Sequence, residues 1–247
     1  APQGIFREEL YAIAFKSHPL QNPIIGWPAD ITSITRDDVY SYYKMYYTPN
    51  NATLVLVGDF QTDEMMKKVK KYFGKIPKGP EVPPVTSVEI EQANAREFTI
   101  SRPDVKAASL TIAFHGPALG DPDGAALMLA RQVLTGFRFS RLNKRIVHDL
   151  KLARQVAFRI DRGKDPVLIR FDIQAFAGEP DKLDHAKEIV FEEIARMQNE
   201  LIDDYELQKI RNNQKYDEIF RNMKISSVAS QLSTYETYHS WKHIDEW

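Results

Sequence analysis

The fold of this chain is decided by residues 9–60, which read ELYAIAFKSHPLQNPIIGWPADITSITRDDVYSYYKMYYTPNNATLVLVGDF. An amphipathic helix precedes the prolines of this stretch. His18-Pro19 and Asn22-Pro23 then push the residue before each proline out of the helical region, so we expect a loop there.

A second helix should follow this loop, because Thr35 stands three residues before Asp38 in a capping-box-like arrangement. Pro49 and the asparagines after it should end that helix. The continuous apolar run at 52–57 predicts a buried strand. Aromatic and apolar residues recur at helical spacing between these points, and we expect them to pack in the core: Val39, Tyr42, Tyr43, Tyr46 and Tyr47.

These pieces resemble the M16 family of zinc metallopeptidases, which includes insulinase, pitrilysin and the mitochondrial processing peptidase. The matching segments are AFKSHPL, IIGW, ITRDDVYSYYKMYYTPNNATLVLVGDF and FSRLNKRIVHDLKLA. The resemblance implies an α+β fold of the bacterial two-module type. Each module would be an α/β sandwich, as in LuxS and the processing peptidase, with a mostly antiparallel sheet covered by helices.

Composition limits the classes of function. The chain has 247 residues, of which 43% are hydrophobic and 27% charged, as is ordinary for a globular protein. The net charge of −1 gives no electrostatic basis for binding nucleic acid or an anionic membrane. There are no cysteines, so disulfides and thiolate metal sites are excluded, and a periplasmic or secreted location is favoured over a cytoplasmic one.

The order of predicted elements indicates three regions. Residues 1–75 would be the C-terminal part of a first M16 domain, in which Thr62 caps a last helix. Residues 76–94 contain four prolines and no apolar period, which is typical of an extended linker. Residues 95–247 would be a second M16 domain, with short strands at 98–100 and 110–114.

Further along, the pattern predicts helices through 125–134 and 142–147, strands at 156–160 and 167–173, and helices at about 181–200, 204–222 and 226–243. The strand at 52–57 needs partner strands that residues 1–74 do not supply. By resemblance, we expect the first module to be incomplete at its N-terminus and the second at its C-terminus.

The zinc motif of the resembled family is H-x-x-E-H on a helix, where two histidines bind zinc and the glutamate acts as general base. None of the six histidines begins this motif. The resemblance places the zinc ligands before Ala1. We therefore expect zinc in the intact family protein, no metal bound to this chain, and no catalytic or metal residue of that kind within it.

One other group has metal-like spacing. His239 and His243 would lie four residues apart on a helix, with Glu236 on the same face. Three such side chains can bind zinc. The alternative is an ordinary helix surface, and Ser240 stands where the general-base glutamate of a direct H-E-x-x-H motif would be.

Two substrate-contact candidates remain, His18 and Arg154. His18 either contacts substrate or fixes its loop by a hydrogen bond. Many M16 enzymes place an Arg and a Tyr seven residues apart near the substrate, but the corresponding positions here are Val147 and Arg154. By strand alternation, Arg154 would lie on the same face as the apolar residues Val156, Phe158 and Ile160. Either the strand therefore begins after Arg154, or the arginine pairs with a carboxylate.

Paired carboxylates have a structural interpretation. Asp37-Asp38 and Asp203-Asp204 each open a predicted helix, where they would cap free amides. Glu192 and Glu193 should form a solvated face.

Two functions fit these observations. In the first, the chain is part of a zinc-dependent M16 endopeptidase that hydrolyses peptides in a chamber between modules, and it is inactive alone. In the second, it is a non-catalytic partner or scaffold subunit that completes the chamber of a zinc-bearing chain. Either reading implies a peptide substrate and pairing with a second M16 module or a homo- or hetero-oligomer. The unpaired strand should make the isolated chain self-associate.

Overall fold

The computed structural model describes residues 2–164 and 167–242. The chain divides into two units, Ala1–Ile100 and Ser101–Trp247.

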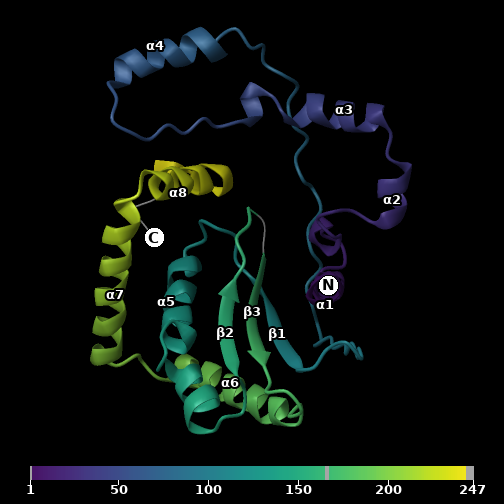
Figure 1. Ribbon diagram of the computed structural model, residues 1–247, viewed down its shortest axis with the longest axis vertical. Helices are drawn as coiled ribbons and strands as arrows, with labels where there is room; N and C mark the ends of the chain where they lie inside the picture. The colour runs from purple at the N-terminus through teal and green to yellow at the C-terminus, as the bar shows by residue number, and fades with distance from the viewer. Residues whose placement is uncertain (1, 165–166, 243–247) are drawn as a thin grey trace. The chain divides into compact units, whose positions relative to one another are not determined.

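The first unit contains helices joined by extended segments (Figure 1). Its elements are α1 (Pro2–Ala14), the 3-10 turn η1 (Pro19–Gln21), α2 (Pro28–Ser33), α3 (Arg36–Tyr46), the 3-10 turn η2 (Pro49–Asn51) and α4 (Thr62–Phe73). The predicted loop and the two helices flanking it are confirmed. The short helix α2 was not predicted, and Thr62 is the first residue of α4 rather than its cap.

Helix α3 begins with the predicted capping box. The Thr35 hydroxyl accepts a hydrogen bond from the Asp38 amide at 3.2 Å, and the Asp38 carboxylate accepts one from the Thr35 amide at 2.9 Å. The carboxylate also accepts from the Thr35 hydroxyl, and these bonds lower the pKa of Asp38 below its ordinary value. Two orphan amides of the helix end are thereby satisfied.

The predicted buried strand at 52–57 is not a strand in this structure. Among the described residues, none forms a sheet ladder with this segment, and Leu54 and Leu56 are 52% and 44% exposed. The segment has the sequence of a strand, but a strand needs neighbours for its backbone groups.

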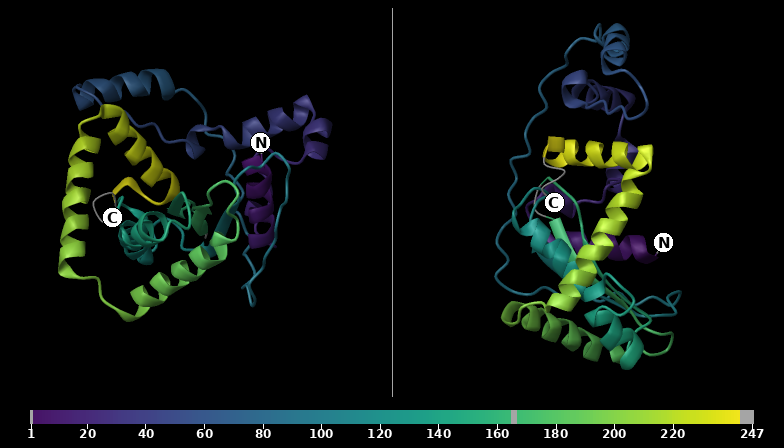
Figure 2. Two further views of the ribbon diagram at one scale, coloured as in Figure 1. Left: turned by 60° about the horizontal axis from the view of Figure 1, so that its bottom comes forward. Right: turned by 90° about the vertical axis from the view of Figure 1, so that its left-hand side faces the viewer.

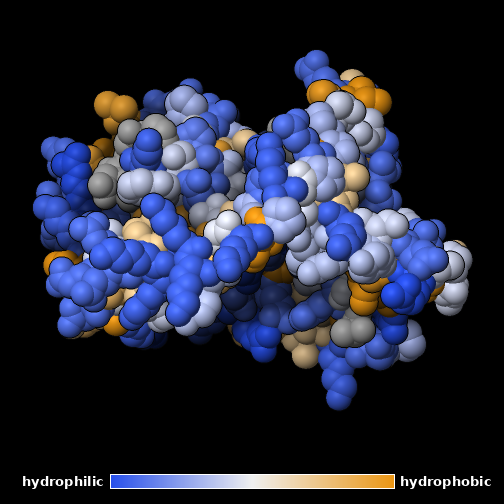
Figure 3. Space-filling model, turned by 90° about the horizontal axis from the view of Figure 1, so that it is seen from above, coloured by the Kyte–Doolittle hydropathy of each residue, from blue (hydrophilic) through white to orange (hydrophobic). Residues whose placement is uncertain are grey.

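Few side chains of the first unit are buried. Leu10 and Phe15 are 6% and 1% exposed, and His18 is 6% exposed. The tyrosines of α3 expected in the core lie at the surface, with Tyr42, Tyr43 and Tyr47 at least half exposed. Figure 3 shows hydrophobic side chains scattered over the molecular surface between hydrophilic ones.

The second unit holds a three-stranded sheet with helices around it (Figures 1 and 2). Its elements are β1 (Ser109–Gly116), α5 (Asp123–Thr135), the π-helix η3 (Asn143–Asp149), β2 (Gln155–Ile160), β3 (Val167–Gln174), α6 (Lys182–Asn199), α7 (Asp204–Asn222) and α8 (Ile225–Tyr238). The strand order is β1-β3-β2 and both pairings are antiparallel, which confirms the α+β class.

One face of the sheet is apolar and carries the core. Ile112, Phe171 and Phe158 lie side by side across the three strands, and the rings of Phe158 and Phe171 stack at 4.3 Å. Residues of α5, η3 and α6 cover this face, and the core they form with it includes Leu134, Leu142, Ile146, Ala186, Ile189 and Val190.

The opposite face is polar, as the alternation in β3 predicts. Asp172 in the central strand accepts a hydrogen bond from Thr111 of β1 at 2.8 Å and pairs with Arg159 of β2 at 2.9 Å. Arg170 pairs with Asp161 at 2.9 Å. These cross-strand contacts hold the three strands in register.

Three further expectations need correction. Residues 98–100 form no strand. The helix predicted through 142–147 is a π-helix, and the last helix ends at Tyr238 rather than at residue 243. Across residues 2–164 and 167–242, no helix has the length and apolar character needed to cross a membrane.

Candidate functional site

The segment from Ser140 to Gln155 contains Val147 and Arg154, the two positions at which the resemblance implies substrate contacts. It consists of η3, a short turn and the start of β2. Leu142 and Ile146 are fully buried, which fixes the helix on the sheet. The Asn143 side chain donates to the carbonyl of Phe137 at 2.8 Å and so ties the entry of the segment to the end of α5.

The turn after η3 carries a strained residue. Lys151 has a φ of 50°, in the left-handed region that favours glycine. The buried residues Leu152 and Ala153 follow at once, and β2 begins at Gln155. Leu150 before it is exposed, so it is the burial of Leu152 and Ala153, with the Leu152 amide bonded to the carbonyl of Ile146 at 2.8 Å, that holds Lys151 in this conformation.

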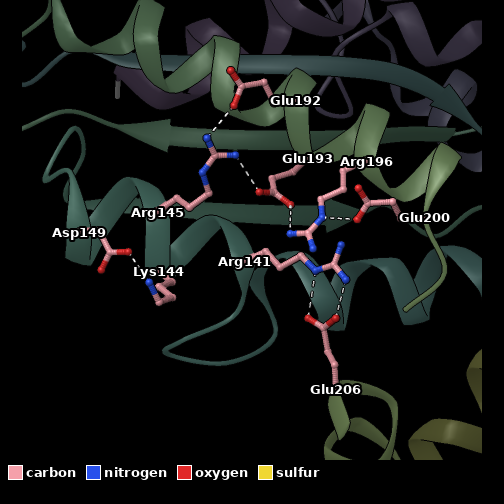
Figure 4. A network of polar contacts seen from close by, with 9 residues as sticks. All are labelled: Arg141, Lys144, Arg145, Asp149, Glu192, Glu193, Arg196, Glu200 and Glu206. Carbon is pink, nitrogen blue, oxygen red and sulfur yellow. Dashed lines mark hydrogen bonds and ion pairs between the residues drawn. The ribbon is translucent and has the colours of Figure 1, made fainter. Parts of the chain in front are cut away.

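A network of ion pairs connects η3 with α6 (Figure 4). Arg145 donates to Glu193 at 2.8 Å and to Glu192 at 2.6 Å. Arg196 lies 4.0 Å from Glu193 and donates to Glu200 at 2.7 Å. The hydrogen bonds that Arg145 donates to Glu192 and, next in weight, to Glu193 raise the pKa of Arg145, which stays charged at any ordinary pH.

Glu193 departs from the sequence prediction. It was expected on a solvated face, but it is 2% exposed. A buried carboxylate is costly unless it is paired, and Arg145 is its closest cation. The apolar residues Ile189 and Val190 precede Glu193 by four and three positions on α6, so helical spacing alone could have placed it on the buried face.

A second ion pair connects the same segment with α7. Arg141 donates to both carboxylate oxygens of Glu206, at 3.2 and 2.6 Å, and both side chains are mostly buried (Figure 4). A bidentate arginine–carboxylate pair is geometrically specific as well as charged. Sequence reasoning missed this pair, because 65 residues separate the partners.

At the two positions that the resemblance aligns with the Arg and Tyr of many M16 enzymes, this chain has Val147 and Arg154. Val147 packs against the buried core. Arg154 lies just before β2, so the strand begins after it, and its side chain is exposed and donates to the side-chain oxygen of Gln174. Its role as a substrate contact stays a proposal.

His18 has structural contacts. Its Nδ1 accepts a hydrogen bond from the Leu20 amide at 3.2 Å, its ring lies 5.9 Å from that of Phe15, and its side chain caps η1. These contacts favour the loop-fixing alternative.

The candidate metal group is only partly covered by the structure. His239 is the C-cap of α8, and Glu236 accepts a hydrogen bond from the amide of Trp241 at 3.1 Å. His243 lies outside the described residues. Within residues 2–164 and 167–242, no three His, Asp or Glu side chains are grouped so that they could hold a metal ion.

The predicted capping role of the paired carboxylates is confirmed for Asp38 and Asp203. Asp38 caps α3 as described above, and Asp203 accepts a hydrogen bond from the Glu206 amide at the start of α7. These carboxylates therefore serve helix ends.

Two hollows occur in the second unit. One of about 370 Å³ is lined mainly by apolar side chains, among them Phe114, Ile169 and Met197, beneath α5 and α6. The other, about 480 Å³, lies against α7 and is lined by Phe137, Tyr205, Gln208, Lys209, Asn212, Asn213 and Tyr216. Neither contains a carboxylate or histidine for acid–base chemistry.

A sequence profile described as "Peptidase M16 inactive domain" matches residues 33–214. The chain belongs to this M16 family.

Curated relatives include zinc proteases. The chain is 25% identical over 238 residues to zinc protease PqqE of Helicobacter pylori, covering 95% of this chain and 53% of that protein. It is 31% identical over 132 residues to a probable β subunit of the mitochondrial processing peptidase of Arabidopsis thaliana, covering 51% of this chain and 24% of that protein. The chain thus spans about half or less of the length of these relatives.

Solved structures agree on the fold. A protease from Helicobacter pylori superposes with a TM-score of 0.91 at 24% identity, over 100% of this chain and 60% of that one. A peptidase M16 inactive domain from Pseudomonas fluorescens gives 0.77 at 20% identity, over 98% and 57%. The periplasmic protease PqqL from Escherichia coli gives 0.73 at 15% identity, over 100% and 28%.

Proposed function

We propose that this chain is the metal-free part of an M16-type zinc endopeptidase and completes a peptide-binding chamber beside a zinc-bearing module. The observation that carries the proposal is the match to zinc protease PqqE, which covers 95% of this chain but only 53% of that protein. The zinc motif is absent from these residues, so the metal would come from another segment or another chain.

The chemistry assigned to the zinc-bearing module is ordinary for such sites. A zinc ion held by that module would supply a Lewis acid for the scissile carbonyl and a bound water of lowered pKa. The residues of this chain would supply the rigid wall opposite, held by the Arg145–Glu193 and Arg141–Glu206 pairs. Arg154, exposed beside β2, is the proposed contact to a substrate carbonyl or carboxylate.

The test is reconstitution. A module with an intact H-x-x-E-H motif, taken from the same protein or its partner, is mixed with residues 1–247, and cleavage of a fluorogenic peptide library is followed with and without a zinc chelator. We expect chelator-sensitive cleavage only in the mixture. Equal cleavage by the zinc module without residues 1–247 would contradict the proposal.

The alternative of a non-catalytic partner subunit has its own support. The fold also matches a chain of complex III2 from Candida albicans with a TM-score of 0.77 at 15% identity, which shows that M16 folds occur in large assemblies. The zinc content of the full-length protein separates the two. One zinc per chain supports the first function, and no zinc together with co-purification of a second M16 chain supports the alternative.

A further inference from the structure

The segment that contains the predicted extended linker, residues 76–94, makes a series of specific contacts within its own unit. We call residues 76–98 the strap. It has no helix or strand, and several of its apolar side chains are exposed, for example Val85 at 62% and Val88 at 81%. Such a segment would be expected to move freely unless particular bonds hold it.

The strongest of these bonds are made by Glu89. Its Oε1 accepts a hydrogen bond from the amide of Lys16 at 2.8 Å. Its Oε2 accepts from the amides of Ser17 and His18 at 3.0 and 2.9 Å. Three consecutive amides therefore point at one carboxylate, which is the arrangement of an anion-binding nest.

The AFKSHPL segment builds this nest. Helix α1 ends at Ala14, so the amides of residues 16–18 are free of the helix ladder. The His18 ring accepts from the Leu20 amide and thereby fixes the turn that presents the three amides. The Ser17 hydroxyl adds a bond of 2.6 Å to the carbonyl of Val88, next to Glu89.

Two further points hold the strap on either side of Glu89. Asn50 bonds to both the amide of Gly79 and the carbonyl of Pro80, at 2.8 and 3.0 Å. Arg96 donates to the carbonyl of Ile13 at 2.7 Å, where a cation is favoured by the C-terminal end of α1.

We propose that the amides of Lys16, Ser17 and His18 form a carboxylate-binding site whose ligand is Glu89, and that this contact latches the strap to the AFKSHPL loop of the same unit. The AFKSHPL loop then serves as the receptor of the latch, which gives His18 a positioning role. The contact goes beyond the proposed function, because it sets how freely residues 76–98 can move within the first unit, whatever the intact protein does.

The latch divides the part of the strap that can move freely. Between the bonds at Pro80 and Arg96 the strap would otherwise be a coil of ~16 residues, whose root-mean-square span is ~22 Å, whereas the ~8 residues on either side of Glu89 span ~16 Å. The Phe98 ring, at the end of the strap, lies 5.4 Å from that of Phe6. The latch therefore limits the motion of residues 76–98 within the first unit.

The test compares Glu89→Gln with Glu91→Gln in residues 1–247. Both variants remove one charge from the strap, but Glu91 is exposed and accepts none of the three amides. Hydrogen exchange should speed up at least ~10-fold at the amides of Ser17 and His18 in Glu89→Gln and stay unchanged in Glu91→Gln. Equal exchange in the two variants would overturn the proposal.

A second measurement uses the lack of native cysteine. Spin labels at Glu8→Cys on α1 and Val85→Cys on the strap, both exposed, report one distance within the first unit. We expect a narrow distribution in the parent and in Glu91→Gln, and a clearly broader one in Glu89→Gln. Ser17→Ala removes the hydroxyl bonds to Val88 and to Glu89 but keeps the three amides, so it should give an intermediate width. A broad distribution already in the parent would overturn the latch.

Discussion

Leu142 and Ile146 in the second unit are 0% exposed, whereas Leu54 and Leu56 in the first are 52% and 44% exposed. Both pairs lie in strongly apolar segments, so hydrophobicity does not account for the difference. The second unit contains a sheet whose strands pair with one another, and its helices have an apolar face to cover. In the described part of the first unit, the segment 52–57 has no strand beside it.

A segment with the sequence of a strand therefore becomes a buried strand only where neighbouring strands supply hydrogen bonds and other elements supply a face to pack on. The first unit instead relies on local devices. A capping box begins α3, Glu89 binds a turn, and Asn50 holds the strap. We expect substitutions to have large effects in the second unit and small effects in the first.

The largest effect should come from the stacked phenylalanines. Phe171→Ala removes a side chain that is 2% exposed and leaves a cavity against Phe158, so we expect a loss of about 3–5 kcal/mol in the free energy of unfolding. Leu54→Ala, at 52% exposure, should stay within about 0.5 kcal/mol. Urea unfolding followed by circular dichroism measures both, and similar losses would remove the contrast between the units.

The next effect concerns the buried carboxylate of Glu193. Arg145→Ala leaves Glu193 buried beside only the more distant Arg196, and we expect a loss of about 1–3 kcal/mol. Lys144→Ala is the matched control, because the Lys144–Asp149 pair is exposed and such pairs contribute about 0–1 kcal/mol. Thermal unfolding at two salt concentrations compares them. A loss in Lys144→Ala as large as in Arg145→Ala would show that burial of Glu193 is not the cause.

A smaller effect of opposite sign is expected at Lys151. Its φ of 50° is strained for a residue with a Cβ, and glycine adopts it freely. Glycine also has more entropy to lose on folding, so Lys151→Gly should stabilise the second unit by only about 0.5–1 kcal/mol. Lys151→Ala keeps the Cβ and serves as the control. An equal gain in the free energy of unfolding in Lys151→Ala would show that loss of the charge, and not relief of backbone strain, is the cause.

The smallest effect is a pH dependence confined to the first unit. Bonds from Thr35 lower the pKa of Asp38, so the ionised form stabilises the start of α3 at neutral pH. This contribution is complete above the ordinary pKa of an aspartate and is lost as the pH falls through the lower folded value. The protection of the first-turn amides of α3 from exchange, relative to their intrinsic exchange rate, should fall below about pH 4 in the parent. In Asp38→Asn the protection should be low at all pH values, and a protection independent of pH in the parent would contradict the capping role.

Much of the fold could be predicted from the sequence, because most elements depend on local signals. The alternation in β2 and β3, the caps at Thr35 and Asp203, and the prolines of the AFKSHPL loop act over a few residues. The buried strand predicted at 52–57 was wrong, because burial there depends on partners distant in sequence.

The ion pairs and the strap could not be predicted in the same way. Arg145 and Glu193 are 48 residues apart, and Ser17 and Glu89 are 72 apart, so no periodicity connects them. The π-helix was missed for another reason. Its apolar spacing is nearly that of an α-helix, and what distinguishes it is backbone bonding over five residues, as from the Leu150 amide to the carbonyl of Arg145 at 3.1 Å.

We propose that residues 1–247 contribute structure to an M16 peptidase and no metal chemistry of their own. The most direct test is the zinc content of the purified chain after dialysis against micromolar zinc, measured together with cleavage of a peptide library. We predict far less than one zinc per chain and no cleavage that a chelator abolishes. Stoichiometric zinc with chelator-sensitive cleavage by this chain alone would contradict the claim.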